Sequence, residues 1–267
     1  MAALEWWRSG PRGGVVMGSE SDRSTTEAAA YRSARSMAVT ARLAARRMSM
    51  EVLRIDPEHP DENALNRVAE EVLRGGIVAF PTDTSYGLAC SLFDTDAVQM
   101  LAQIKRRSRS HAFISLIPEP LQAWGLGAEV SAVAERLIDL YWPGPLSLIL
   151  RASSLVPVRV LGRGGTIALR CPMATLCQRI LERIGGPVVS SSANLSGEPP
   201  AESAAEVVAV FGNQLDLVLD GGPRRARPPT TLVDVSGERP RLLRRGALDV
   251  TAELGSFDDA TQVPKQA

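Results

Sequence analysis

The sequence predicts an α/β fold in which helices flank one twisted mixed sheet. Apolar residues at helical spacing alternate with short apolar strands over most of the chain, which is typical of this class. From residue 217 onward, strands follow one another without an intervening helix, so we expect a mixed sheet. A chain of 267 residues that is 45% hydrophobic can bury such a core.

The first half of the domain is organised around a buried strand that opens into a polar turn. After Gly75, the apolar run at 77–80 breaks at Pro81 into hydroxyl side chains, and ligands of open α/β sheets bind beyond strand ends of this kind. An ordinary capped turn is the alternative interpretation. The other elements expected here are strands at 51–55 and 113–117, a helix at 65–73, and a helix at 97–104 capped by Asp94 or Thr95.

The second half contains a second strand that opens into hydroxyls. Beginning at Pro187, it leads into the run Ser190, Ser191 and Ser192. The remaining expected elements are helices at 131–141, 174–184 and 204–211 and strands at 146–150, 166–170, 217–220, 231–235 and 241–243.

Composition changes at residue 50 and again near residue 250. Residues 1–49 carry scattered Ser, Ala, Gly and Arg without a helical or strand period, so we expect a disordered or non-native extension there. Acidic residues in this stretch disfavour an organelle targeting peptide. We expect a single domain at 50–250 and a frayed tail at 251–267.

Charge and cysteine content exclude several classes of protein. The formal net charge is zero, so no overall field draws the chain to nucleic acid or to a membrane. Three cysteines and two histidines without metal-ligand spacing predict neither a disulfide framework nor a metal site, and they fit the cytoplasm. No apolar run approaches the length of a membrane span.

Standard catalytic motifs are missing from the sequence, although polar side chains suited to anions are present. There is no GxxxxGK[ST] loop, and a serine nucleophile would lack a suitably placed histidine. Lys105 opens a basic cluster at a helix end, for which a solvated helix terminus is the alternative interpretation. Hydroxyl and cationic groups on separate elements suit phosphates and a carboxylate held together: Thr84, Lys105, Arg107, Arg170, Ser190, Ser192, Thr230 and Arg244.

Seven motifs, in order, resemble those of the YrdC/YciO family over about residues 50–249. They are PTDTSYGL (81–88), KRR (105–107), WPGPLSLIL (142–150), TIALRCP (166–172), SSSANLSG (190–197), TTLVD (230–234) and LRRGAL (243–248). Synthase members of this family make threonylcarbamoyl-AMP for a modified adenosine of tRNA. The resemblance implies a YrdC-like domain with a large concave basic cavity.

The resemblance also implies roles for individual residues. Lys105 and Arg107 would be catalytic, and Thr84, Arg170 and Ser190 would bind L-threonine. The residues implied for ATP are Arg107, His111, Thr166, Ser192, Asn194, Thr230 and Arg244, with Asn194 fixing the serine turn.

The implied reaction joins L-threonine, bicarbonate and ATP and makes the protein a nucleotidyltransferase. A carbamate oxygen attacks the α-phosphorus, so positioning and charge stabilisation suffice without a general base. Mg²⁺ would arrive with ATP and need no dedicated protein cage. The implied partners are tRNA and a downstream threonylcarbamoyl transferase, with no membrane.

Departures from the family pattern leave alternatives open. They occur at Ser108, His111, Ala112, Pro200 and Arg245, and the first alternative is a divergent YciO-like paralogue that binds nucleotide or RNA without synthase activity. The second is an RNA-binding module that uses arginines near 106–109 and 224–227. The third is a carbamoyl-transfer domain like that of hydrogenase maturation proteins.

Overall fold

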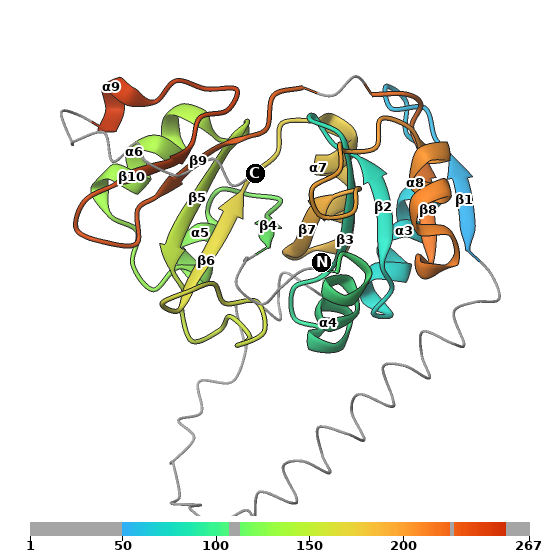
Figure 1. Ribbon diagram of the computed structural model, residues 1–267, viewed down its shortest axis with the longest axis horizontal. Coiled ribbons are helices and arrows are strands. Elements are labelled where there is room, and N and C mark those ends of the chain that lie inside the picture. Colours follow the sequence, from blue (N-terminus) through green and yellow to red (C-terminus); the bar gives the residue numbers. More distant parts are fainter. Residues whose placement is uncertain (1–49, 107–112, 225–226, 255–267) are drawn as a thin grey trace, which may run out of the picture.

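A ten-stranded mixed sheet forms the centre of the computed structural model, which describes residues 50–106, 113–224 and 227–254 (Figure 1). The strand order is β1-β8-β2-β3-β7-β4-β6-β5-β9-β10. The strands are β1 (Glu51–Arg54), β2 (Val78–Pro81), β3 (Tyr86–Ser91), β4 (Ile114–Leu116), β5 (Leu146–Arg151), β6 (Thr166–Arg170), β7 (Val188–Ser192), β8 (Leu217–Asp220), β9 (Thr231–Asp234) and β10 (Arg241–Arg244).

Parallel and antiparallel pairings are interleaved along the sheet. β8 runs parallel to both β1 and β2, β4 runs parallel to β6, and β5 runs parallel to β9. The other neighbouring pairs, including β2 with β3 and β3 with β7, are antiparallel. The mixed sheet predicted from the late strands is therefore confirmed.

Helices cover both faces of this sheet. α3 (Glu62–Leu73) and α7 (Thr175–Ile184) pack against each other and supply one buried core. The second core takes apolar side chains from α4 (Thr95–Ile104), α5 (Gln122–Leu126), α6 (Ala132–Tyr141), α8 (Ala204–Phe211) and α9 (Thr251–Leu254). A short 3₁₀ helix, η1 (Gly212–Gln214), follows α8.

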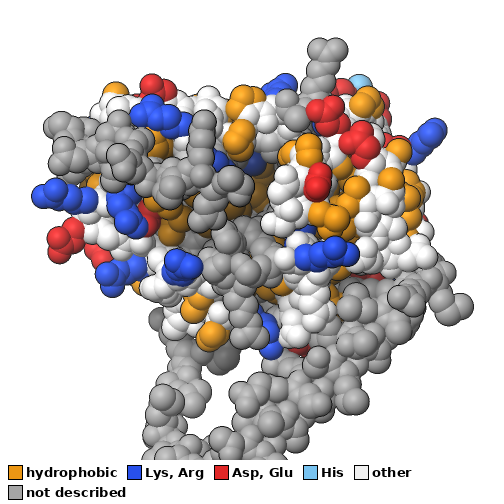
Figure 2. Space-filling model, in the orientation of Figure 1, with side chains coloured by type: hydrophobic (Ala, Val, Ile, Leu, Met, Phe, Trp, Pro, Cys, Tyr) orange, Lys and Arg blue, Asp and Glu red, His pale blue; other side chains and the backbone are white. Residues whose placement is uncertain are grey.

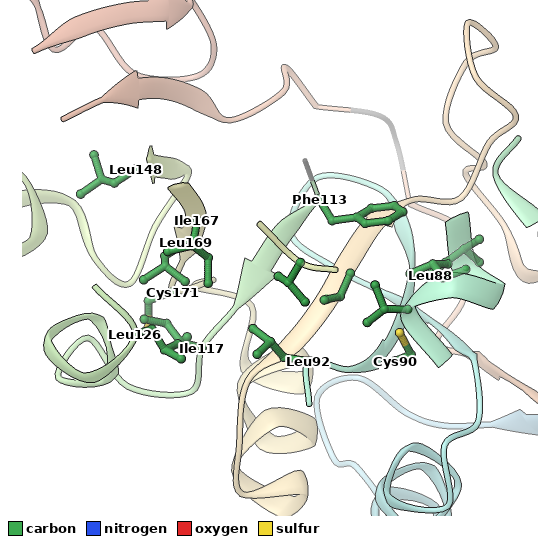
Figure 3. Close-up of a cluster of buried hydrophobic side chains, with 14 of the residues drawn as sticks. Leu88, Cys90, Leu92, Phe113, Ile117, Leu126, Leu148, Ile167, Leu169 and Cys171 are labelled. Atoms are coloured by element: carbon green, nitrogen blue, oxygen red, sulfur yellow. The ribbon is translucent and has the colours of Figure 1, made fainter. Parts of the chain in front are cut away.

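Alternation along β2 shows how the two cores are separated. Val78 and Phe80 belong to the core of α3 and α7, whereas Ala79 belongs to the other core. Successive side chains of a strand point to opposite faces, so a continuous apolar run is buried on both sides. Figure 3 shows the larger core, where Leu88 and Cys90 of β3 share one apolar cluster with Leu169 of β6.

Four elements of the described chain were not expected from the sequence: β3, α5, α9 and the 3₁₀ helix η1. β3 lies where only a turn and its exit were expected, and α5 and α9 are helices of five and four residues. α9 lies beyond the boundary expected at residue 250, and it is anchored by buried Leu254 and by a 2.7 Å hydrogen bond from the Tyr141 hydroxyl to Glu253. No helix in the described part of the chain has the length and apolarity needed to cross a membrane.

Candidate functional site

The candidate site is a cavity of about 500 Å³ at the ends of several strands. Its walls come from the β2–β3 turn, β4, β6, β7, the segment before β9 and the end of β10. The lining residues are Thr82, Thr84, Ser85, Tyr86, Gly87, Ile114, Leu116, Arg170, Ser190, Ser191, Ser192, Pro200, Arg227, Pro229, Thr230 and Arg244. Figure 2 shows basic side chains on both halves of the visible face, including a group at the left over the half that β5, β6, β9 and β10 form in the same orientation of Figure 1.

The β2–β3 turn is closed by its own hydroxyl groups. The Thr82 backbone N–H and hydroxyl both donate to the Ser85 carbonyl, at 2.9 and 2.8 Å. Thr82 Oγ1 also accepts from the Thr84 backbone N–H at 3.2 Å and lies 3.1 Å from Thr84 Oγ1. Hydroxyls that satisfy nearby backbone groups in this way stabilise tight turns. The turn therefore holds Thr84 at the cavity wall.

The second hydroxyl stretch lies beside the first because β7 pairs with β3. Ser192 is opposite Gly87 in the register, and Ser190 is opposite Ala89. A Cβ atom on Gly87 would lie 3.4 Å from Ser190 Oγ, which shows how near the serine hydroxyl is to the β3 backbone. The two stretches singled out in the sequence thus line one cavity.

Lys105 holds the serine turn (residues 190–194) through hydrogen bonds. It is 3% exposed at the C-terminal end of α4, and its ammonium group donates to the Ser192 carbonyl at 2.5 Å and to Asn194 Oδ1 at 3.0 Å. It also donates to the Asn194 carbonyl, while the Ser192 hydroxyl donates to Asn194 Oδ1 at 2.6 Å. Lys105 and Asn194 are not among the described residues that line the cavity.

Arg170, at the end of β6, is fixed by acceptors from two different turns. Its Nη2 pairs with Asp83 Oδ2, and its Nε donates to the Gly144 carbonyl at 3.2 Å. The side chains of Arg170 and Asp83 are only 6% and 10% exposed. The guanidinium group therefore has one orientation at the cavity wall.

Arg244, on β10, supplies the second guanidinium group of the cavity and is half-buried. Its Nε donates to the Thr230 carbonyl at 2.9 Å and its Nη2 donates to Thr230 Oγ1 at 2.8 Å. Thr230 Oγ1 in turn lies 2.8 Å from the hydroxyl of buried Ser147. Burial, and then the positive charge of Arg170, lower the pKa of Arg244. An anion placed between these guanidinium groups would relieve their repulsion.

The loop after β8 closes another side of the cavity. The Tyr86 hydroxyl donates to the Gly222 carbonyl at 2.8 Å, and the Arg227 backbone N–H donates to the Thr84 carbonyl at 3.1 Å. Burial and the nearby charge of Asp220 raise the pKa of Tyr86 to about 12, so its hydroxyl stays a donor at neutral pH. Arg227 is thereby held at the cavity wall.

The structure brings together most of the residues expected from the sequence. Thr84, Arg170, Ser190, Ser192, Thr230 and Arg244 line the cavity, and Lys105 and Asn194 hold its serine turn. Thr166 begins β6, at the opposite end from Arg170, and its hydroxyl donates to the Arg163 carbonyl at 3.0 Å. Arg107 and His111, along with the departures at Ser108 and Ala112, lie outside the described residues.

The residues of the site that were not assigned to it from the sequence include Asp83, Tyr86, Ser147 and Arg227. Asp83 and Tyr86 stand inside the PTDTSYGL motif, so their position beside Thr84 was an available signal. Ser147 had no such signal, because its role depends on the pairing of β5 with β9 that brings it to Thr230.

A mixed sheet that gathers hydroxyl and guanidinium groups at its strand ends defines an α/β domain with a polar ligand cavity. The chain belongs to the Sua5/YciO/YrdC family, whose model, described as telomere recombination, matches residues 70–246. The resemblance seen in the sequence motifs is therefore confirmed.

The relatives described here include proteins named threonylcarbamoyl-AMP synthase and a protein named YciO. Threonylcarbamoyl-AMP synthase of Coxiella burnetii is 36% identical over 180 residues, which are 67% of this chain and 97% of that protein. The protein of the same name from Pyrococcus abyssi is also 36% identical, over 68% of this chain, but the chain spans only 54% of that relative. YciO of Escherichia coli, named as uncharacterized, is 32% identical over 73% of this chain and 95% of its own.

The solved structures similar to this chain include proteins from P. abyssi and E. coli. P. abyssi Sua5 complexed with L-threonine superposes with a TM-score of 0.70 at 33% identity, covering 74% of this chain and 58% of that one. E. coli YciO also gives 0.70, at 30% identity, covering 76% and 98%. Full-length HypF, at 22% identity and a TM-score of 0.60, shares the fold alone.

Proposed function

We propose that this protein is an L-threonylcarbamoyladenylate synthase, a nucleotidyltransferase that uses L-threonine, bicarbonate and ATP. One observation carries the proposal: Arg170 and Arg244 line a single cavity together with hydroxyl groups from two neighbouring strands. Guanidinium groups bind carboxylates and phosphates through paired hydrogen bonds, and hydroxyls add donors of adaptable direction. The names of relatives that this chain resembles along nearly their whole length support the same reaction.

In the proposed reaction, the cavity orients two anions for attack. The amine of threonine combines with carbon dioxide to form a carbamate, and a carbamate oxygen forms a bond to the α-phosphorus while the bond to pyrophosphate breaks. Arg170, Thr84 and Ser190 hold the amino acid. Arg244, Thr230 and Ser192 face the nucleotide, where positive charge stabilises the developing charge on phosphorus.

Magnesium enters this proposal as the counter-ion of the triphosphate. Among the described residues, no three His, Cys, Asp or Glu side chains gather into a metal-binding group. Phosphate oxygens and water would therefore supply most of its ligands, as is usual for Mg²⁺ bound with a nucleotide. The proposal also includes action in the cytoplasm, with tRNA and a threonylcarbamoyl transferase downstream.

Pyrophosphate release tests the proposal directly. The full chain is incubated with ATP, Mg²⁺, bicarbonate and labelled L-threonine, and a synthase of known activity is assayed in parallel as the positive control. We expect pyrophosphate to appear only when threonine is present, together with a labelled nucleotide adduct. ATP binding without threonine-dependent release would instead assign the chain to the YciO-like alternative.

A further inference from the structure

Asp83 is the acidic partner of the Arg170 guanidinium group, although it plays no part in closing its own turn. The turn bonds come from Thr82 and Ser85. Asp83 instead sends its side chain to Arg170, and both side chains are at least nine-tenths buried. Burying a carboxylate costs free energy of desolvation, so we expect the Asp83 carboxylate to have a role at the site that offsets this cost.

The second carboxylate oxygen of Asp83 also indicates that this side chain serves Arg170. Asp83 Oδ1 is buried and has no hydrogen-bond partner among the described residues. The carboxylate is therefore held through one oxygen only, and its charge is directed at Arg170. A purely structural carboxylate would be expected to use both oxygens.

This pairing gives the two ends of the cavity different charge. The charge of Arg170 is offset by its ion pair with Asp83, while Arg244 donates to the neutral oxygens of Thr230. A neutralised guanidinium group still donates hydrogen bonds to a carboxylate, but it attracts a polyphosphate weakly. It also tolerates the ammonium group of a zwitterion, which a bare guanidinium group would repel.

We propose that Asp83 is a positioning residue that aims Arg170 and sets its charge, so that this end of the cavity selects a net-neutral α-amino acid and excludes phosphate. The inference rests on the proposed function and adds the origin of its substrate selectivity. Selectivity here is a difference between two affinities, produced as much by excluding phosphate as by binding the amino acid.

Calorimetric titration of the full chain with L-threonine, and separately with ATP, tests the proposal without depending on turnover. We expect Asp83→Asn to weaken threonine binding by about tenfold and to leave ATP binding within about twofold, a difference set by one lost charge interaction. Inorganic phosphate should compete with threonine in this variant and not in the wild type. Asp83→Glu, which keeps the charge, should restore part of the threonine affinity.

Glu71→Gln is the matched control, because Glu71 is a 16% exposed carboxylate paired with Arg67 on α3 at 2.8 Å. It should leave both affinities unchanged. Equal loss of both ligands in Asp83→Asn, or unchanged threonine affinity with no phosphate competition, would overturn the role of Asp83 while the proposed function stands. A wild-type protein that binds ATP but not threonine would overturn the proposed function and this inference with it.

Discussion

The ammonium group of Lys105 donates to the backbone carbonyl of Ser192 at 2.5 Å, across 87 positions of sequence. Two further acceptors belong to Asn194, so one buried cation fixes the whole serine turn. The consequence is that Lys105 affects stability as well as any chemistry at the site.

Replacing Lys105 with methionine should therefore destabilise the protein. Methionine fills a similar volume but cannot donate, so the part-buried carbonyl groups of Ser192 and Asn194 would lose this donor, and a polar group left unsatisfied costs about 1–3 kcal/mol when it is fully buried. We expect the free energy of unfolding in urea to fall by roughly 2–4 kcal/mol. Arg106→Met changes the neighbouring exposed side chain and should stay close to wild type. Equal unfolding energies for the two variants would contradict the anchoring role.

Removing the Arg244 guanidinium group should weaken nucleotide binding. The substitution removes a half-buried positive charge from the cavity wall, and a hydrogen bond to a charged group contributes about 1.5–3 kcal/mol. Arg244→Gln should raise the dissociation constant for ATP by roughly ten- to a hundredfold, measured by calorimetry at constant salt. Arg241→Gln is the control, because Arg241 lies on the same strand but is 61% exposed and pairs with Asp234. A wild-type ATP affinity in Arg244→Gln would show that the nucleotide binds elsewhere.

The close approach at Gly144 should make this position intolerant of any side chain. A Cβ atom there would lie 2.2 Å from the Tyr141 carbonyl oxygen, so the backbone must shift. Because the Gly144 carbonyl accepts from Arg170 Nε, the shift would also misplace that guanidinium group. We expect Gly144→Ala to lower thermal stability, by about 1–3 kcal/mol at the midpoint, and to weaken threonine binding.

Gly186→Ala serves as the comparison for Gly144→Ala. A Cβ atom at Gly186 would meet nothing within 4 Å. Its melting temperature should match the wild type within about one degree, since surface changes cost little. Should both alanine variants melt alike, the steric account of Gly144 would be wrong.

Asp234 should make stability depend on acid pH. Burial alone would raise its pKa, but hydrogen bonds from Ser236 and Arg241 outweigh burial and lower the pKa below the ordinary 3.8. A carboxyl group with a lowered folded-state pKa stabilises the fold above 3.8, and this contribution disappears as the pH falls through the folded-state pKa. The stability difference between wild type and Asp234→Asn, from urea unfolding at several pH values, should therefore shrink below pH 4. A difference that is constant with pH would contradict this assignment.

Local patterns in the sequence predicted most of the fold. The helix capped by Asp94, the helix expected at 174–184 and the strand 166–170 agree with the structure because each is specified by its own local pattern, a cap in the first case and apolar spacing in all three. β3 was missed because YGLACS follows a turn directly and is buried on both sides, so it shows no alternation.

The site was predicted less completely because it depends on how distant strands are placed. Thr84 and Ser190 could be singled out by their motifs, but the pairing of Asp83 with Arg170 joins a turn after β2 to the end of β6. β3, β7 and β4 lie between those strands in the sheet. Local sequence carries no information on that order of strands. The structure also places Thr166 and Arg170 at opposite ends of β6.

The position of β10 at the edge of the sheet affects when the site can form during synthesis. The chain must be synthesised through Gly246, whose missing side chain allows close contact with Pro229 and Thr230, before Arg244 can take its place in the cavity wall. A chain that stops near residue 240 would consequently lack β10 and, with it, the guanidinium group that Arg244 contributes to the cavity wall.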